Sequence, residues 1–212
     1  MGVAPHRHLP ERPPLVSVEV HPAAADRFPD VATILAPAKP STPACWCLTY
    51  RITNAENHTL RGPDRPERLR GLCHADPPPG MIAYVDGVPA GWCSFGPRSS
   101  FNRLVKARTI PHVDETPAWS VICFIVRPQF RRTGLSRALL DAVVDYAKGR
   151  SDVPVLEAYP IDSTAGRVSA SFAYVGTTSL FEAAGFKRVT LTSARSGGAD
   201  RWLMRRPMTK PS

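Results

Sequence analysis

The sequence lacks the features that mark several large classes of protein. Its 212 residues contain no run of eighteen apolar residues, and its Pro- and Arg-rich beginning has no apolar centre like that of a signal peptide. Neither G-x-x-x-x-G-K-S/T nor a G-x-G-x-x-G between a strand and a helix is present. A nucleoside-triphosphate P-loop and a dinucleotide fingerprint are therefore not expected. We expect a cytoplasmic protein that does not enter a membrane.

Cysteine is scarce, and its number and spacing argue against both disulfides and a metal site. The chain has five cysteines, an odd number that fits reduced thiols better than a disulfide framework. Cys45 and Cys47 are separated by one residue, where zinc sites have two to four, and His74 beside Cys73 completes no recognisable ligand pattern. We therefore expect no bound metal.

Acidic residues are outnumbered, so an anionic partner is expected. The formal net charge of +9 comes from 27 Lys and Arg against 18 Asp and Glu. Such an excess suits either nucleic acid or a small polyanionic ligand. No aromatic stacking motif accompanies the basic residues, which disfavours nucleic acid. One cluster is interpreted as the solvated face of a helix or as a surface for an acidic partner: Arg61, Arg65, Arg68 and Arg70.

The most informative stretch is an apolar strand that runs through an Arg-rich turn into an amphipathic helix. Residues 119–126 are mostly apolar, β-branched or aromatic, and Pro128 forbids their continuation as a central strand. Apolar residues then recur at helical spacing from Leu135 until about Gly149. The free N–H groups of the first helical turn are partly positive, and Gly134 lets the backbone approach a ligand closely. A phosphate or pyrophosphate is expected here, among Arg131, Arg132 and Arg137.

The letters of this turn resemble the signature of the GNAT N-acetyltransferase superfamily. The family carries R/Q-x-x-G-x-G/A after a strand that ends in V-x-P, and here Arg131-x-x-Gly134-x-Ser136 follows a strand that ends at residues 126–128. Ser136 replaces the usual Gly or Ala, which leaves room for a pyrophosphate but adds a hydroxyl. The alternative is a plain strand, turn and helix with surface arginines.

A second segment also resembles this family. Residues 179–186 read as a short helix closed by Gly185, followed by an apolar residue that begins a strand. This is similar to the family's Y-E-x-x-G-F ending, with Phe181 at the position of the tyrosine. The resemblance covers roughly residues 80–192 and is faint before them.

The resemblance implies an α/β fold of mixed type: a central, mostly antiparallel twisted sheet with a splayed pair of parallel strands, flanked by helices. Asp86-Gly87 predicts a β-hairpin, and the crossover helix makes the strands beside it parallel. Strands are expected at residues 15–20, 81–85, 90–95, 119–126, 153–159, 189–192 and 201–205. Helices are expected at residues 23–35, 66–75, 135–149 and 179–185, with a helical turn at 101–108. The structure of residues 40–57 is left open.

One domain with a tail is expected from the length and composition. Residues 1–13 are expected to be disordered, and residues 14–207 to form a single GNAT domain. Within it, residues 14–117 would form the acceptor-side half and residues 118–192 the half that binds acetyl-CoA. The preference for Arg, Ala and Pro over Lys and Asn indicates a GC-rich bacterial genome.

By the same resemblance, the co-substrate is acetyl-CoA, held without a metal in the gap between the two parallel strands. Backbone groups of the first strand would bind the pantetheine arm, and N–H groups of the turn would bind the pyrophosphate. The residues expected to bind acetyl-CoA are Phe124, Ile125, Val126, Arg131, Arg132, Thr133, Gly134, Leu135, Ser136 and Arg137.

Acyl transfer needs a base for the amine, a donor for the oxyanion and a proton for the leaving thiolate. Glu157 is the candidate base, because some GNAT enzymes that acetylate amines carry a carboxylate here; alternatively it pairs with an arginine or faces solvent. The family's usual proton donor is replaced by Phe181, which cannot donate a proton. Tyr174 or Tyr159 is the candidate substitute; alternatively both only pack, and water protonates the thiolate.

The predicted function is acetyl-CoA-dependent transfer of an acetyl group to an amine of a small molecule or peptide, by direct attack on the thioester. One alternative is a catalytically weak GNAT-like protein that binds acyl-CoA, for which Phe181 is the argument. The other is a basic protein associated with nucleic acid. Whether the chain is a monomer or a homodimer is left open.

The sequence does not identify the acetyl acceptor. Asp114 and Glu115 either line the path of a cationic amine or serve solubility, and residues 162–176 are expected to form a lid over the acceptor side. Three aromatic residues either wall a pocket or belong to the core: Trp46, Tyr50 and Trp92.

Overall fold

The computed structural model describes residues 17–39, 42–162, 164, 169 and 172–208. The tail expected at residues 1–13 lies outside these ranges. A seven-stranded sheet runs in the order β1-β2-β3-β4-β5-β7-β6, and of its neighbouring strand pairs β4–β5 is the parallel one. The strands are β1 (Val18–Pro22), β2 (Gly80–Val85), β3 (Val88–Pro97), β4 (Ala118–Val126), β5 (Val155–Ala158), β6 (Lys187–Ser196) and β7 (Ala199–Pro207). The predicted mixed fold is confirmed.

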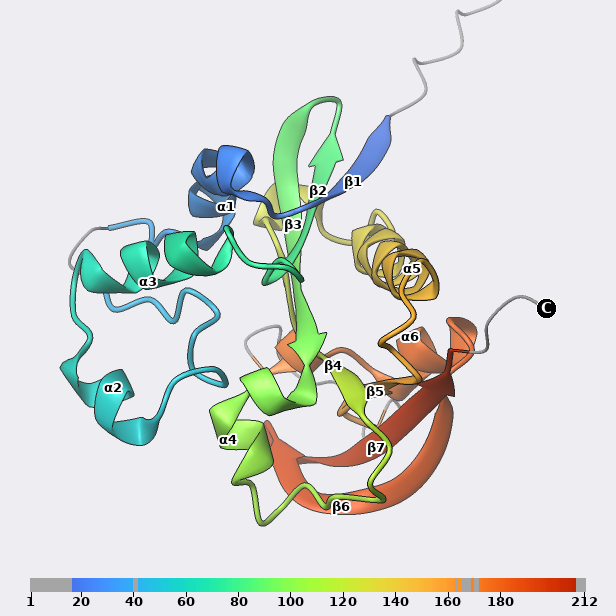
Figure 1. Ribbon diagram of the computed structural model, residues 1–212. Coiled ribbons are helices and arrows are strands. Elements are labelled where there is room, and N and C mark those ends of the chain that lie inside the picture. Colours follow the sequence, from blue (N-terminus) through green and yellow to red (C-terminus); the bar gives the residue numbers. More distant parts are fainter. Residues whose placement is uncertain (1–16, 40–41, 163, 165–168, 170–171, 209–212) are drawn as a thin grey trace, which may run out of the picture.

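Helices cover both faces of the first strands of the sheet (Figure 1). Met81 and Ala83 of β2 face the core beneath α5, whereas Ile82 faces the core beneath α1 and α3. The helices are α1 (Phe28–Leu35), α2 (Asn54–Thr59), α3 (Asp64–Leu72), α4 (Asn102–Val105), α5 (Leu135–Lys148) and α6 (Thr178–Ala183). Short 3-10 turns are η1 (Ala25–Arg27), η2 (Arg98–Ser100), η3 (Pro128–Phe130) and η4 (Ala173–Val175). Within the described ranges, no helix has the length and apolar character needed to cross a membrane.

The crossover helix α5 forms as its apolar spacing predicts. It begins directly after Gly134, whose φ of +85° suits glycine and ends the preceding turn. One face is buried against the sheet, and each Leu or Val on it contributes about 1.5–3 kcal/mol relative to exposure. The buried residues are Leu135, Leu139, Leu140, Val143, Val144 and Ala147.

The hairpin predicted at Asp86-Gly87 is present, and a second hairpin joins the last two strands of the chain. Asp86 (φ +49°) and Gly87 (φ +75°) join β2 to β3 in the left-handed conformation that two-residue hairpins need. Gly197 and Gly198 join β6 to β7 in the same way. Gly185 closes α6 as predicted, where the Phe186 N–H donates to the Phe181 carbonyl at 3.0 Å.

Element boundaries differ from the predictions in places where proline or a local cap decides. The strand expected at residues 153–159 is shortened to β5, because Pro154 and Pro160 cannot donate to a sheet ladder. The segment left open contains a turn at residues 46–51, then α2. Thr53 starts α2 through a reciprocal capping box with Glu56.

Candidate active site

The parallel strands β4 and β5 are paired over only part of their length. Their register runs from Ala118 opposite Val155 to Val121 opposite Ala158. A register shift in the β3–β4 ladder leaves Ile122 as an extra residue on β4, which is a β-bulge. Beyond the bulge no described strand pairs with this edge of β4, so the two strands part there. We call this region the splay.

Directly after β4, five consecutive backbone N–H groups, those of residues 132–136, donate to no acceptor in the described part of the chain. The hydrogen bonds of α5 begin with the N–H of Arg137, which donates to the carbonyl of Gly134 at 2.9 Å. Arg132 (φ +62°) and Gly134 (φ +85°) are both left-handed. Such residues within a run of free N–H groups form a concavity that suits an anion. We call residues 131–137 the cradle.

The side chains around the cradle make it electropositive. A cavity of about 250 Å³ is lined by cradle residues together with Val126, Phe130 and Leu180. Arg137 is neutralised in part by Asp141, whose two oxygens accept from its Nε at 2.8 and 2.7 Å. Among the described carboxylates none pairs with Arg131 or Arg132, so their charge is available to a ligand.

The acetyl-CoA implied by the resemblance fits this arrangement. The cradle offers N–H donors and two unpaired cations to a pyrophosphate, and the splay offers an unpaired strand edge to the amides of a pantetheine arm. The predicted cofactor residues therefore fall on two adjoining segments, 124–126 and 131–137. Phe124 itself points into the core, so that only its backbone is offered. Their part in binding stays a prediction.

Glu157 is buried, and both of its carboxylate oxygens are occupied. It is 1% exposed. Its Oε1 accepts from Nε and Nη2 of Arg205 at 2.7 and 2.6 Å. Its Oε2 accepts from the Tyr159 hydroxyl at 2.6 Å and lies 3.4 Å from Nε of Arg98. These contacts match the alternative in which Glu157 pairs with arginine, and its role as a base stays a prediction.

The Glu157 network also lies at the other end of β4 from the cradle. Glu157 is opposite Ser120, six residues and about 20 Å before Val126 at strand spacing. It lines a separate cavity of about 460 Å³ that opens beside the start of β4. Asp114 belongs to the same network, because its carboxylate accepts a hydrogen bond from Arg205. This hydrogen bond lowers the pKa of Asp114 to about 2. Glu115 lines the cavity.

The two tyrosines considered as proton donors differ in their surroundings. Tyr159 is 1% exposed, and its hydroxyl donates to Glu157; burial and this carboxylate raise its pKa. Tyr174 is half-buried in η4, with its hydroxyl 3.5 Å from that of Tyr50. Burial and Tyr50 raise the pKa of Tyr174. Of the two, Tyr174 is the one whose hydroxyl is not bound to a carboxylate.

The Phe181 side chain packs in the core and has no proton to donate. Its side chain is fully buried, with ring centroids 6.0 Å from Phe124 and 5.1 Å from Phe186. The position therefore offers no proton to the splay, although α6 and its glycine cap form as the family pattern predicts.

Three arginines at these sites are not among the predicted residues: the buried Arg98 and Arg201 and the partly buried Arg205. Arg98 and Arg205 flank Glu157, and Arg201 lies beside Tyr50. A signal was present for two of them. Arg201 and Arg205 alternate with the buried Leu203 on one face of β7, so the strand's inward positions carry arginine.

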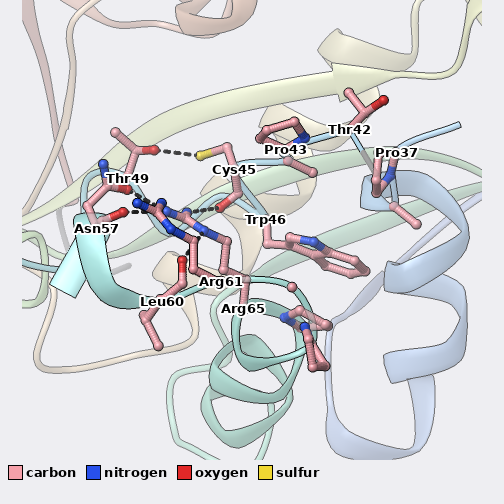
Figure 2. A pocket seen from close by; sticks show the side chains of 15 residues that line it. Pro37, Thr42, Pro43, Cys45, Trp46, Thr49, Asn57, Leu60, Arg61 and Arg65 are labelled. Atoms are coloured by element: carbon pink, nitrogen blue, oxygen red, sulfur yellow. Dashed lines mark hydrogen bonds between the residues drawn. The ribbon is translucent and has the colours of Figure 1, made fainter. Parts of the chain in front are cut away.

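A larger cavity, of about 870 Å³, lies between the loop after α1, helix α2 and the start of α3 (Figure 2). Trp46 forms one wall, and Arg65 crosses it to donate to the carbonyls of Asn57 and Leu60 at 2.9 and 3.2 Å. Cys47, next to Trp46, lies with its Sγ 3.7 Å from that of Cys123 on β4. This turn therefore lines the cavity with Trp46 and contacts β4 with Cys47.

The three aromatic residues considered as pocket walls lie in different surroundings. Trp92 is fully buried in the core, whereas Trp46 lines a cavity and Tyr50 faces Tyr174. All five cysteines are free thiols, and the described residues hold no group of three metal-ligating side chains. Part of the lid expected at residues 162–176 lies outside the described residues.

A family model and solved structures match this chain. The model of the acetyltransferase (GNAT) family matches residues 46–165. A GNAT-family acetyltransferase from Streptococcus pneumoniae aligns at a TM-score of 0.54 and 12% identity, over 91% of this chain and 100% of its own. Ard1 from Thermoplasma volcanium aligns at 0.51 and 13%, over 91% and 99%. The aminoglycoside acetyltransferase AAC(6')-Ib, solved with coenzyme A, aligns at 0.52 and 15%, over 90% and 95%. A search of curated proteins by sequence gives no match.

Proposed function

Since the chain belongs to the GNAT acetyltransferase family, we propose that it transfers the acetyl group of acetyl-CoA to an amine of a small molecule or peptide, by direct attack on the thioester. The observation that carries the proposal is the run of five unpaired N–H groups at residues 132–136, directly after the splayed strand.

The cradle and the splay would share the work of binding. N–H groups of residues 132–136 bind the pyrophosphate, and Arg131 and Arg132 add long-range attraction for its charge. The unpaired edge of β4 orients the pantetheine arm between β4 and β5. When bound, acetyl-CoA supplies the activated acetyl group, and the protein contributes mainly positioning.

Proton transfer would involve a tyrosine near the splay. Tyr174 is our candidate donor to the departing thiolate, because its hydroxyl is held by another tyrosine and not by a carboxylate. Glu157 remains the candidate base from the sequence, but its contacts with Arg98 and Arg205 favour a role in holding β5 against β7. An amine that arrives neutral would need no base from the protein.

A second function is favoured by one specific observation. Phe181 removes the family's usual proton donor, so the chain could bind acyl-CoA without efficient turnover. Binding of acetyl-CoA with no release of thiol in the presence of amines would support this second function.

A free-thiol assay over a panel of amines tests the proposal. The panel contains alkylamines, peptides with a free N-terminus, peptides with lysine, and aminoglycosides. We expect at least one amine to accelerate the release of coenzyme A thiol. A Gly134→Glu variant, described below, gives the background. No acceleration by any class, with acetyl-CoA bound, would favour the binding function instead.

A further inference from the structure

Arg201 is a buried cation without a described anionic partner. It is 5% exposed, yet no carboxylate of the described residues lies within 4.0 Å of its guanidinium. Its Nε donates to the carbonyl of Tyr159 at 2.7 Å, and its Nη1 donates to the hydroxyl of Tyr50 at 3.3 Å. A buried charge of this kind costs free energy unless something nearby is negative. A negative charge that formed near Arg201 during a reaction would therefore be stabilised by its guanidinium.

The hydrogen bonds of this group have a fixed direction at one end. Arginine can only donate, so the Tyr50 oxygen accepts from Arg201. The Tyr174 oxygen lies 3.5 Å from that of Tyr50, and either hydroxyl can be the donor in this pair. When Tyr50 donates, Tyr174 accepts, and the O–H proton of Tyr174 has no acceptor among the described residues. In that arrangement the donors run from Arg201 through Tyr50 to a free O–H at Tyr174.

This free O–H lies at the splay. Arg201 is bound to the carbonyl of Tyr159, which is the first residue after β5, where the two parallel strands have parted. Tyr50 packs against the same small core as Cys123 of β4. The turn η4, which carries Tyr174, packs against β4. The three side chains therefore lie beside the point where β4 and β5 part.

We propose that Tyr174 is the catalytic proton donor to the departing thiolate of coenzyme A, and that Tyr50 and Arg201 are positioning residues that orient its proton and stabilise the charge it leaves. The proposal rests on the proposed function. It assigns the task lost at Phe181 to three residues that the family motif does not contain.

The transfer balances in protons and charge. As the amine nitrogen bonds to the acetyl carbon, the carbon–sulfur bond breaks and leaves a thiolate. The Tyr174 O–H gives its proton to this sulfur, and Tyr50 gives its proton to the Tyr174 oxygen. The negative charge then lies on the oxygen of Tyr50, 3.3 Å from Nη1 of Arg201, until a proton from solvent returns. The amine loses its proton to solvent.

The test uses coenzyme A itself, because the acceptor is unidentified. The pKa of the bound thiol is measured from the ultraviolet absorbance of its thiolate across a pH series, with the signal of the protein alone subtracted. A tyrosine O–H that donates to the sulfur stabilises the thiolate and lowers this pKa. Tyr174→Phe should therefore raise it by about one to two pH units, the worth of one hydrogen bond to a charged group. Affinity for the adenine-nucleotide end should not change.

Two further variants test the positioning residues. Tyr50→Phe and Arg201→Met should each raise the pKa of the bound thiol, by less than Tyr174→Phe. Arg201→Lys keeps the charge and serves if Arg201→Met does not fold. Tyr84→Phe is the matched control and should leave the pKa of the thiol unchanged, since the Tyr84 hydroxyl donates to Asp30 and β3 separates β2 from β4 in the sheet.

The outcomes separate this inference from the function on which it rests. If wild-type protein does not bind coenzyme A, the proposed function fails and this inference with it. If it binds coenzyme A and Tyr174→Phe leaves the pKa of the thiol unchanged, the proton-donor role is refuted while the function stands. If Tyr174→Phe raises the pKa but neither Tyr50→Phe nor the Arg201 variants do so, the positioning roles are refuted.

Discussion

Gly134 offers the sharpest perturbation of the cradle. It lies at the start of α5 with φ +85°, and a Cβ built there meets no atom within 4 Å. A glutamate at this position therefore keeps enough space to fold, and its carboxylate enters the concavity that the five free N–H groups form. Gly87 provides a matched control, because it has φ +75° and equally open surroundings in the β2–β3 turn. The two variants should lose similar stability, about 1–2 kcal/mol for a left-handed residue with a Cβ.

The effect on binding should differ greatly. A carboxylate about 5 Å from a pyrophosphate with two negative charges is repelled by about 2–6 kcal/mol, for effective dielectric constants between that of water and that of a protein surface. This corresponds to a loss of affinity of about 30-fold or more for coenzyme A. Gly134→Glu should show this loss, whereas Gly87→Glu should bind as wild type does.

Isothermal titration calorimetry with coenzyme A measures both affinities, and thermal unfolding confirms that both variants are folded. Low ionic strength should increase the difference between them, because the repulsion is screened by salt. A folded Gly134→Glu protein with wild-type affinity for coenzyme A would falsify the assignment of the cradle.

Three further predictions follow from the same contacts. Arg131→Ala and Arg132→Ala should each weaken coenzyme A binding by about tenfold or less, since exposed charges contribute little singly; calorimetry at two salt concentrations checks this. Glu157→Gln should lower the free energy of unfolding by about 3 kcal/mol in urea titrations, as breaking a buried ion pair does, and reduce turnover by one factor for all amines. A loss confined to amines that are protonated at the assay pH would instead restore the base role. The pKa of Asp114, lowered to about 2 by Arg205, means that its stabilisation is complete at neutral pH and is lost as the pH falls from about 4 to 2. Asp114→Asn should flatten the unfolding free energy in that range.

Local rules predicted much of the fold. The spacing of apolar residues after Leu135, the Asp86-Gly87 turn and the glycine at position 185 each act within a few residues, and each gave the observed element. The cradle followed from the same local chemistry. Its signal lay in one strand, one turn and one helix, which are consecutive in the chain.

The chemistry of the splay could not be read in this way. The partners of Glu157 come from residues 98 and 205, which are far apart in the sequence and meet only when β3 and β7 are in the sheet. Tyr50 and Tyr174 are separated by 124 residues. The boundaries of β5 depend on Pro154 and Pro160, which cannot donate to a sheet ladder.

The proposed reaction is direct transfer of an acetyl group from acetyl-CoA to an amine. Mass spectrometry of both the amine and the intact protein, after reaction with acetyl-CoA that carries an isotopically heavy acetyl group, shows where that group goes. We predict that the heavy acetyl group appears on the amine, in equal amount to the thiol released, and that none stays on the protein. Bound acetyl-CoA that remains intact with every amine of the panel, or a heavy acetyl group fixed to the chain, would contradict it.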